Sequence, residues 1–254
     1  MRHAASPGTA IAILVLAGAC WWTVAGRAAG MAAEPGPMGL GFWTFLAVWA
    51  LMMAAMMLPA VAPVASMYAA SIVPRTPGPP RGARIAAMVA GYLVVWSAVG
   101  VLAYGATLAA RAVARDQPDA ATWGAAAVFG VTAAYQLSPL RARCLRHCRA
   151  PFALLFRLTA RRGSMRDLRA GVLHGGICAA CCIPLMACLL ALGAMSIGWM
   201  MLLTAVVVLE RHPRHGRWMT YGAAAGLLVL AVVVLFHPEL APGLHQPDGG
   251  PMPM

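Results

Sequence analysis

Long apolar runs alternate with short polar stretches along most of this chain. The runs cover residues 9–26, 40–62, 85–110, 121–138, 171–192, 195–209 and 218–236. Most are close to the roughly 20 residues that a helix needs to cross a bilayer, although the run at 195–209 is short. Only helices and closed barrels can cross hydrocarbon, and runs of this length are typical of helices. The pattern therefore predicts an all-α fold, a polytopic integral membrane bundle of about seven transmembrane helices.

The first run, at 9–26, has a second interpretation. It follows a short tail with Arg2, as in a secretory signal or a degenerate lipoprotein signal that ends at Cys20. More spans follow, however, and Trp21 and Trp22 suit the interfacial belt of a retained helix. We therefore expect an uncleaved first span. Cleavage would leave six spans and would keep the orientation of the others.

Composition supports a membrane protein, and the distribution of arginine predicts its orientation. The chain is 61% hydrophobic and 10% charged, whereas about 25% of the residues of a soluble domain are charged. Its 19 basic residues are all arginine, and alternate polar segments hold most of them: one before the first run, three after 40–62, nine in 139–170 and three after 195–209. Cytoplasmic loops carry the excess of positive charge, so the N-terminus is expected inside. The net charge of +12 then reflects topology and does not indicate a nucleic-acid partner.

Residues 139–170 form the most basic segment. They hold nine arginines and a short apolar cluster at 152–158 that cannot span a bilayer. Such a segment is typical of an amphipathic helix that lies on an anionic leaflet. We expect anionic lipid to bind here, and we expect the Pro- and Gly-rich tail after His237 to be disordered.

The run at 171–192 carries the residues with the clearest chemistry. Four of its side chains follow one another at intervals of four along one face of a helix, with Cys181 beside them: His174, Cys178, Cys182 and Met186. Imidazole, thiolate and thioether groups are soft or borderline metal ligands. Cysteine also packs well as a small apolar residue, so core packing is the alternative interpretation. Three cysteines within five positions, preceded by a histidine, favour a metal or redox site.

The run at 40–62 holds a methionine cluster, consisting of Met52, Met53, Met56 and Met57. They make two pairs at i and i+4 on adjoining faces, and packing by a flexible side chain is the alternative interpretation. The predicted orientation puts the cluster in the inner half of the bilayer, at the depth of the cysteines in 171–192. Thioethers that face thiols at one depth would suit Cu(I).

Cys144 and Cys148 follow the run at 121–138 and lie one helical turn apart. They can share a metal ion or form a redox pair, and the neighbouring Arg143, Arg146 and Arg149 would favour thiolate. Idle reduced thiols are the alternative interpretation. The sequence shows no Ser/His/Asp arrangement, phosphate loop or paired intramembrane carboxylates, so an enzyme is not the favoured interpretation.

Three blocks of sequence together resemble a bacterial family of predicted metal-binding integral membrane proteins, a domain-of-unknown-function family. The first block is Met52–Pro59 and the second contains Tyr135, Gln136, Pro139, Leu140, Cys144 and Cys148. The third contains His174, Gly175, Cys178, Cys181, Cys182, Leu185, Met186, Gly193, Met195, Trp199, Met200 and Glu210. The family motif tends to read Gly-Cys-Cys-Trp, whereas Ala180 and Ile183 flank the cysteine pair here, so the aromatic ring is missing.

The resemblance covers about residues 40–212 and implies a multi-pass protein of the bacterial inner membrane that binds a metal. We expect 40–212 to be the family membrane domain. It lies between a first helix with its outer loop (1–39) and a last helix with its outer tail (213–254). The metal ligands that the resemblance implies are Met52, Met53, Met56, Met57, Cys144, Cys148, His174, Cys178, Cys181 and Cys182.

These features favour a soft-metal protein, with Cu(I) as the expected metal and zinc or no metal as the alternatives. The protein would act in metal transfer or homeostasis, with Cys144 and Cys148 as an inner docking site. The expected partners are the lipid bilayer and a metallochaperone or another membrane protein. A thiol-redox protein that uses Cys181–Cys182 or Cys144–Cys148 is the second hypothesis. A non-catalytic scaffold with a basic inner surface is the third.

Overall fold

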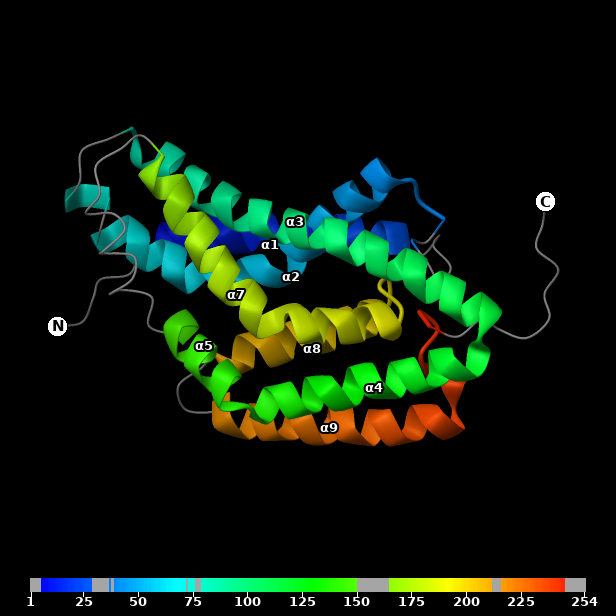
Figure 1. The fold of residues 1–254 in the computed structure, drawn as a ribbon. Coiled ribbons are helices and arrows are strands. Elements are labelled where there is room, and N and C mark those ends of the chain that lie inside the picture. Colours follow the sequence, from blue (N-terminus) through cyan, green and yellow to red (C-terminus); the bar gives the residue numbers. More distant parts are fainter. Residues whose placement is uncertain are drawn as a thin grey trace.

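The computed structural model describes residues 6–28, 37, 39–71, 73–75, 79–149, 165–211 and 216–244. These residues form helices and no strands, which confirms the all-α fold class (Figure 1). The helices are α1 (Pro7–Ala28), α2 (Phe42–Ser71), α3 (Arg81–Asp116), α4 (Pro118–Leu137), α5 (Pro139–Arg149), α7 (Arg166–Ala191), α8 (Ile197–Glu210) and α9 (Gly216–Phe236). Two short 3₁₀ turns, η1 (Val73–Arg75) and η2 (Pro238–Leu240), follow α2 and α9.

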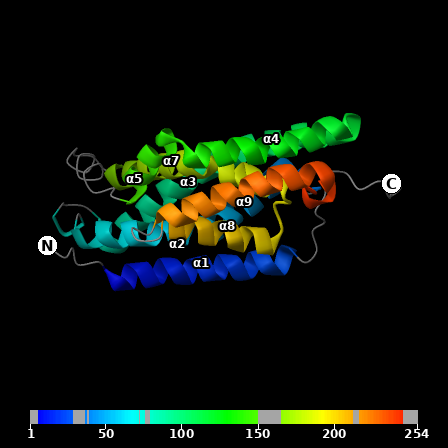
Figure 2. The same ribbon diagram turned by 90° about the horizontal axis from the view of Figure 1, so that it is seen from below.

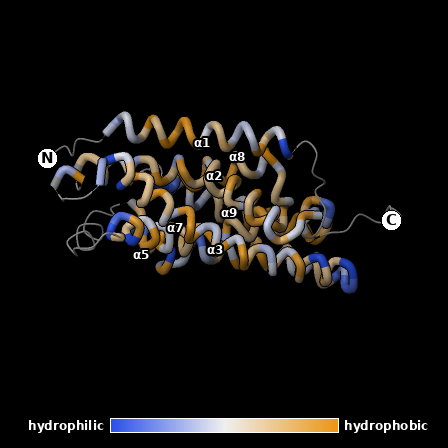
Figure 3. Tube along the Cα trace, turned by 90° about the horizontal axis from the view of Figure 1, so that it is seen from above, coloured by the Kyte–Doolittle hydropathy of each residue, from blue (hydrophilic) through white to orange (hydrophobic). Residues whose placement is uncertain are grey.

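The long helices lie side by side in a bundle (Figures 1 and 2). The closest neighbours are α3 with α7, α1 with α2, and α4 with α9. Many of the largest buried side chains, among them Phe45, Trp49 and Tyr68, come from α2. Hydrophilic positions gather toward the two ends of the bundle, and the middle is largely hydrophobic (Figure 3). This distribution of polarity is the one expected of helices that cross a bilayer.

Five of the described helices are long and apolar enough to cross a membrane: α1, α2, α3, α7 and α9. Helix α8 is apolar but has 14 residues, and α4 falls outside the five. Several helices are therefore suited to crossing a membrane, while the count of seven spans and their orientation stay predictions.

Each predicted run corresponds to one helix, and two helices extend well beyond their runs. Helix α2 continues past Pro59 and Pro63 to Ser71. A proline removes one backbone hydrogen bond and bends a helix, but Val64 and Tyr68 after the second proline are buried in the core. Burial of these side chains stabilises the extra turns. Helix α3 is also longer than its run at both ends.

A buried ion pair lies where α3 and α7 begin. Arg84 donates to the Asp167 carboxylate from Nε to Oδ2 at 3.0 Å and from Nη2 to Oδ1 at 2.9 Å. Tyr68 of α2 donates its hydroxyl to the same carboxylate. The sequence pattern treats Arg84 as a charge of a cytoplasmic turn, but it is 2% exposed. The ion pair joins α2, α3 and α7 at one end of the bundle.

Glycines allow α3 and α7 to cross with their backbones in contact. A Cβ on Gly171 would lie 1.9 Å from the Met88 carbonyl oxygen, and one on Gly91 would lie 2.3 Å from the Leu168 carbonyl oxygen. One on Gly175 would lie 3.1 Å from the Tyr92 carbonyl oxygen. Small residues four apart let helices approach closely in this way.

Two predictions fall on residues that the structure does not describe. These are the apolar cluster at 152–158, with its proposed contact to anionic lipid, and the end of the tail from 245 onward. The described start of the basic segment, residues 139–149, forms α5, which packs against α7.

Candidate metal centre

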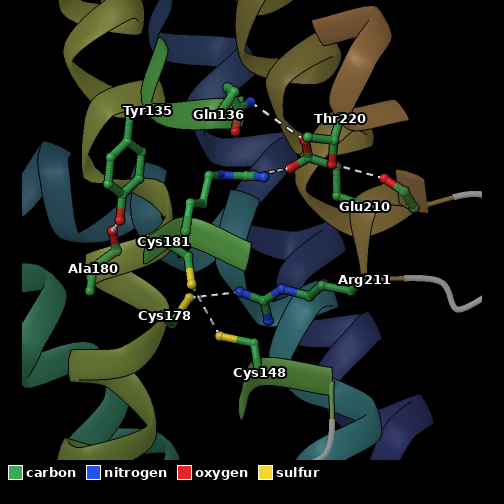
Figure 4. Close-up of polar contacts among 11 residues, drawn as sticks. Tyr135, Gln136, Cys148, Cys178, Ala180, Cys181, Glu210, Arg211 and Thr220 are labelled. Atoms are coloured by element: carbon green, nitrogen blue, oxygen red, sulfur yellow. Dashed lines mark hydrogen bonds and ion pairs between the residues drawn. The ribbon is translucent and has the colours of Figure 1, made fainter. Parts of the chain in front are cut away.

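Two cysteines from different helices face each other at the centre of the candidate site. The Sγ atoms of Cys148 on α5 and Cys181 on α7 are 3.6 Å apart, and both side chains are buried (Figure 4). Two thiolates that bind one tetrahedral metal ion at about 2.3 Å lie about 3.8 Å from each other. The two sulfur atoms are therefore spaced almost as two of the four ligands of a tetrahedral ion would be.

The Cys148 thiol lies outside the five helices that are suited to crossing a membrane, and its pKa is shifted. The hydrogen bond that it accepts from Cys181 lowers the pKa of Cys148, against the opposing effect of burial. The charges of Arg211 and Arg141 also lower this pKa. The charge pattern predicts that Arg143, Arg146 and Arg149 favour the thiolate. The direction of the pKa shift is therefore as expected, but the arginines that cause it are different.

Cys178 lies one helical turn before Cys182 on α7 and contacts two side chains from other helices. Arg211, at the C-terminal end of α8, donates from Nη2 to the Cys178 Sγ at 2.8 Å (Figure 4). The hydroxyl of Tyr92 on α3 lies 3.0 Å from the same sulfur. Arg211 also donates from Nη1 to the Ala60 carbonyl oxygen of α2 at 2.9 Å.

His174 is buried one turn before Cys178, and its ring stacks on the ring of Tyr92. The ring centroids are 5.9 Å apart and the interplanar angle is 25°. The His174 Nε2 atom is buried without a hydrogen-bond partner among the described residues. A neutral imidazole nitrogen in this position can act as a ligand.

The methionine cluster is fully buried on α2, with 0% exposure at all four positions. Arg211 contacts both Ala60 and Cys178, so these two residues lie at one level of the bundle. Met56 lies one turn before Ala60, and Cys182 lies one turn after Cys178. The contact between Tyr68 and Asp167 shows that α2 and α7 are antiparallel, so both turns lead in the same direction. The shared depth agrees with the sequence analysis, while the thioethers stay predicted ligands.

A buried polar cluster joins α4 and α5 to the end of α8. Arg141 of α5 donates from Nη2 to Glu210 of α8, and Gln136 of α4 donates to the same carboxylate at 3.4 Å (Figure 4). The charge pattern of the basic segment predicts that Arg141 lies on the surface. It is 2% exposed, because Glu210 provides a buried counter-charge. Cys144 lies one turn after Arg141 and is half-buried.

A tyrosine of α4 donates to the backbone carbonyl that a proline in α7 leaves without its helical donor. Pro184 has no N–H, so it cannot bond the Ala180 carbonyl four residues earlier. The Tyr135 hydroxyl donates to this carbonyl oxygen at 2.7 Å (Figure 4). Thr132, one turn before Tyr135, donates to the Pro184 carbonyl oxygen at 3.2 Å. The resemblance singled out Tyr135 and Gln136, and both turn out to position helices.

The structure thus brings Cys148 of α5 and Cys181 of α7 together and adds residues that the sequence did not indicate. Tyr92 and Arg211 contact Cys178, and Glu210 anchors α5. Glu210 belongs to the third resemblance block, which was the one available signal. Within the described part of the chain, no three His, Cys, Asp or Glu side chains converge closely enough to hold a metal ion. The donors still fit Cu(I) in kind, since thiolate sulfur is a soft ligand of the type that this ion prefers.

Comparisons with known proteins add a family. No curated protein and no solved structure matches the chain. Residues 46–234 match the model of the PpoB2 family, which is described as copper chaperone. The match includes the methionine cluster, all the cysteines of the candidate site, and Arg211. The chain therefore belongs to the PpoB2 copper chaperone family.

Proposed function

We propose that this protein is a bacterial inner-membrane carrier that binds Cu(I) between Cys148 and Cys181 and passes it on. Membership in a copper chaperone family supports the metal, and five helices of suitable length and polarity support the membrane. The observation that carries the proposal is the 3.6 Å separation of two buried sulfur atoms from different helices. Soft thiolates select Cu(I) over harder ions.

In this proposal the remaining candidate ligands receive the ion after it leaves Cys148 and Cys181. Cys182 and Cys178 continue along α7, and the imidazole of His174 lies one turn further. The methionine cluster offers thioethers at the depth of Cys182. Cys144, half-buried on α5, lies at the edge of the site and would meet a metallochaperone. The lipid bilayer, with anionic lipid at the basic segment, completes the proposed surroundings.

The test is a Cu(I) titration of the purified protein in detergent, without oxygen, in competition with a chromogenic Cu(I) chelator. We expect wild type to bind one Cu(I) per chain, and we expect a Cys148→Ser/Cys181→Ser double variant to lose this binding. Two matched controls should bind as wild type does. Cys188→Ser changes a buried thiol of the same helix that bonds Thr132 instead, and Cys20→Ser changes a thiol of α1. Equal binding by wild type and the double variant would refute the proposal.

A thiol-redox protein is the second candidate, because the same two sulfur atoms are close enough to be joined by a small movement of α5. A disulfide requires about 2.05 Å between the sulfurs. Treatment with an oxidant, followed by mass spectrometry of the Cys148 and Cys181 peptides, separates the two proposals. A redox protein forms this disulfide reversibly and binds no Cu(I), whereas a copper carrier binds Cu(I) when both thiols are reduced.

A further inference from the structure

Arg211 places a positive charge of the protein itself against the sulfur atom of Cys178. The guanidinium of Arg211 bridges two helices, with one nitrogen 2.8 Å from the Cys178 Sγ and another 2.9 Å from the Ala60 carbonyl oxygen. Arginine is always charged in proteins. Among the described residues, Cys178 is therefore the α7 cysteine with an arginine side chain against its sulfur.

A Cu(I) ion on Cys178 would compete directly with this guanidinium. A metal–thiolate bond of about 2.3 Å would put the ion on the sulfur that accepts the Arg211 hydrogen bond. Two positive charges a few ångströms apart repel strongly where little water screens them. Metal binding at Cys178 is therefore disfavoured while the Arg211 guanidinium lies against the sulfur.

The neighbour of Arg211 ties its position to the first thiol pair. Glu210 binds Arg141 of α5, and α5 also carries Cys148. Glu210, the last residue of α8, thus holds α5, which bears Cys148. The next residue, Arg211, contacts Cys178. A shift of α5 would therefore act on both positions.

We propose that Arg211 is an internal gate, a cation that keeps Cu(I) off Cys178 so that the ion rests at Cys148 and Cys181 until Arg211 withdraws. This inference rests on the proposed function and adds the order of occupancy within the site. In the transfer step Cys178 acts as the thiolate that accepts the Arg211 hydrogen bond: this hydrogen bond breaks and a Cu–Sγ bond to Cys178 forms, so no proton has to leave. The Cys148 thiolate leaves the ion with its electron pair. Copper stays Cu(I), the guanidinium keeps its protons, and no oxidant or reductant is needed.

The test compares Arg211→Gln with Arg211→Lys in the anaerobic Cu(I) titration against a chromogenic chelator. We expect one Cu(I) per chain in wild type and in Arg211→Lys, which keeps a cation. We expect two Cu(I) ions per chain in Arg211→Gln, because Cys178 and Cys182 then bind a second ion. Cys178→Ser in the Arg211→Gln background should return the value to one. Arg143→Gln is the matched control, because it removes an exposed charge of α5, and it should bind one.

Different outcomes overturn different statements. No Cu(I) binding by wild type would refute the proposed function itself. One Cu(I) in both wild type and Arg211→Gln would refute the gate and leave the function in place. The Cys178→Ser variant provides a test that does not depend on the folding of Arg211→Gln. With Arg211 present, this substitution should change the Cu(I) dissociation constant by less than about threefold, whereas a tenfold weakening would show that Cys178 is already a ligand.

Discussion

Gly171 offers the sharpest test of how tightly the bundle is built. In Gly171→Ala the new Cβ would lie 1.9 Å from the Met88 carbonyl oxygen, whereas Cβ atoms essentially never approach closer than 3.0 Å. The obstacle is backbone, so α3 and α7 must separate by about 1 Å over the crossing. Overpacking of this kind costs up to about 3 kcal/mol. The better helix propensity of alanine returns up to about 1 kcal/mol, which leaves a net loss of about 2 kcal/mol.

The measurement is the free energy of unfolding of the purified protein, from titration with a denaturing detergent in micelles. Gly176→Ala is the control on the same helix, because its Cβ would meet nothing within 4 Å. That variant should equal wild type or gain up to about 1 kcal/mol. If Gly171→Ala and Gly176→Ala have the same stability, the two helices do not cross in backbone contact. Separation of α3 from α7 should also weaken the Tyr92 contact with Cys178, which is 3.0 Å in wild type.

Two further predictions use the same unfolding measurement. Asp167→Asn removes the buried negative charge that Arg84 faces, and it should lower stability by about 3 kcal/mol. Asp116→Asn, an exposed change at the end of α3, should stay within about 0.5 kcal/mol, and equal effects would contradict the buried ion pair. Tyr135→Phe removes the hydroxyl that donates to the Ala180 carbonyl oxygen, and it should cost about 1 kcal/mol. No loss in that variant would show that the carbonyl has another donor.

Much of the fold could be predicted from the sequence because the signals are local. Apolar runs of span length predict helices wherever they occur, and each run became one. Gly171 and Gly175 have the four-residue spacing of small residues that lets helices pack closely, and both lie in the α3–α7 crossing. The similar pair Gly222/Gly226 does not, since a Cβ at either position would meet nothing within 4 Å. The spacing alone identifies a helix face without large side chains. Only the tertiary structure shows whether another helix packs against that face.

The contacts of the site could not be predicted, because they join distant parts of the chain. Cys148 and Cys181 are 33 residues apart and meet only because α5 folds back against α7. The local spacing instead suggested Cys148 with Cys144. Arginine in a membrane protein reports topology first, so a pattern of charges does not separate Arg141, which is buried beside a carboxylate, from the exposed arginines of the same helix.

Pro184 has a consequence for how the chain is assembled. A helix with an unbonded carbonyl is costly to leave in hydrocarbon, because no water is present to satisfy it. The donor for the Ala180 carbonyl oxygen is Tyr135 of α4, which precedes α7 along the chain. Synthesis proceeds from the N-terminus, so α4 is already made when α7 is synthesised. The proline in α7 therefore favours docking onto α4 soon after α7 is made, and the cysteines of α7 take their places only once an earlier helix has received them.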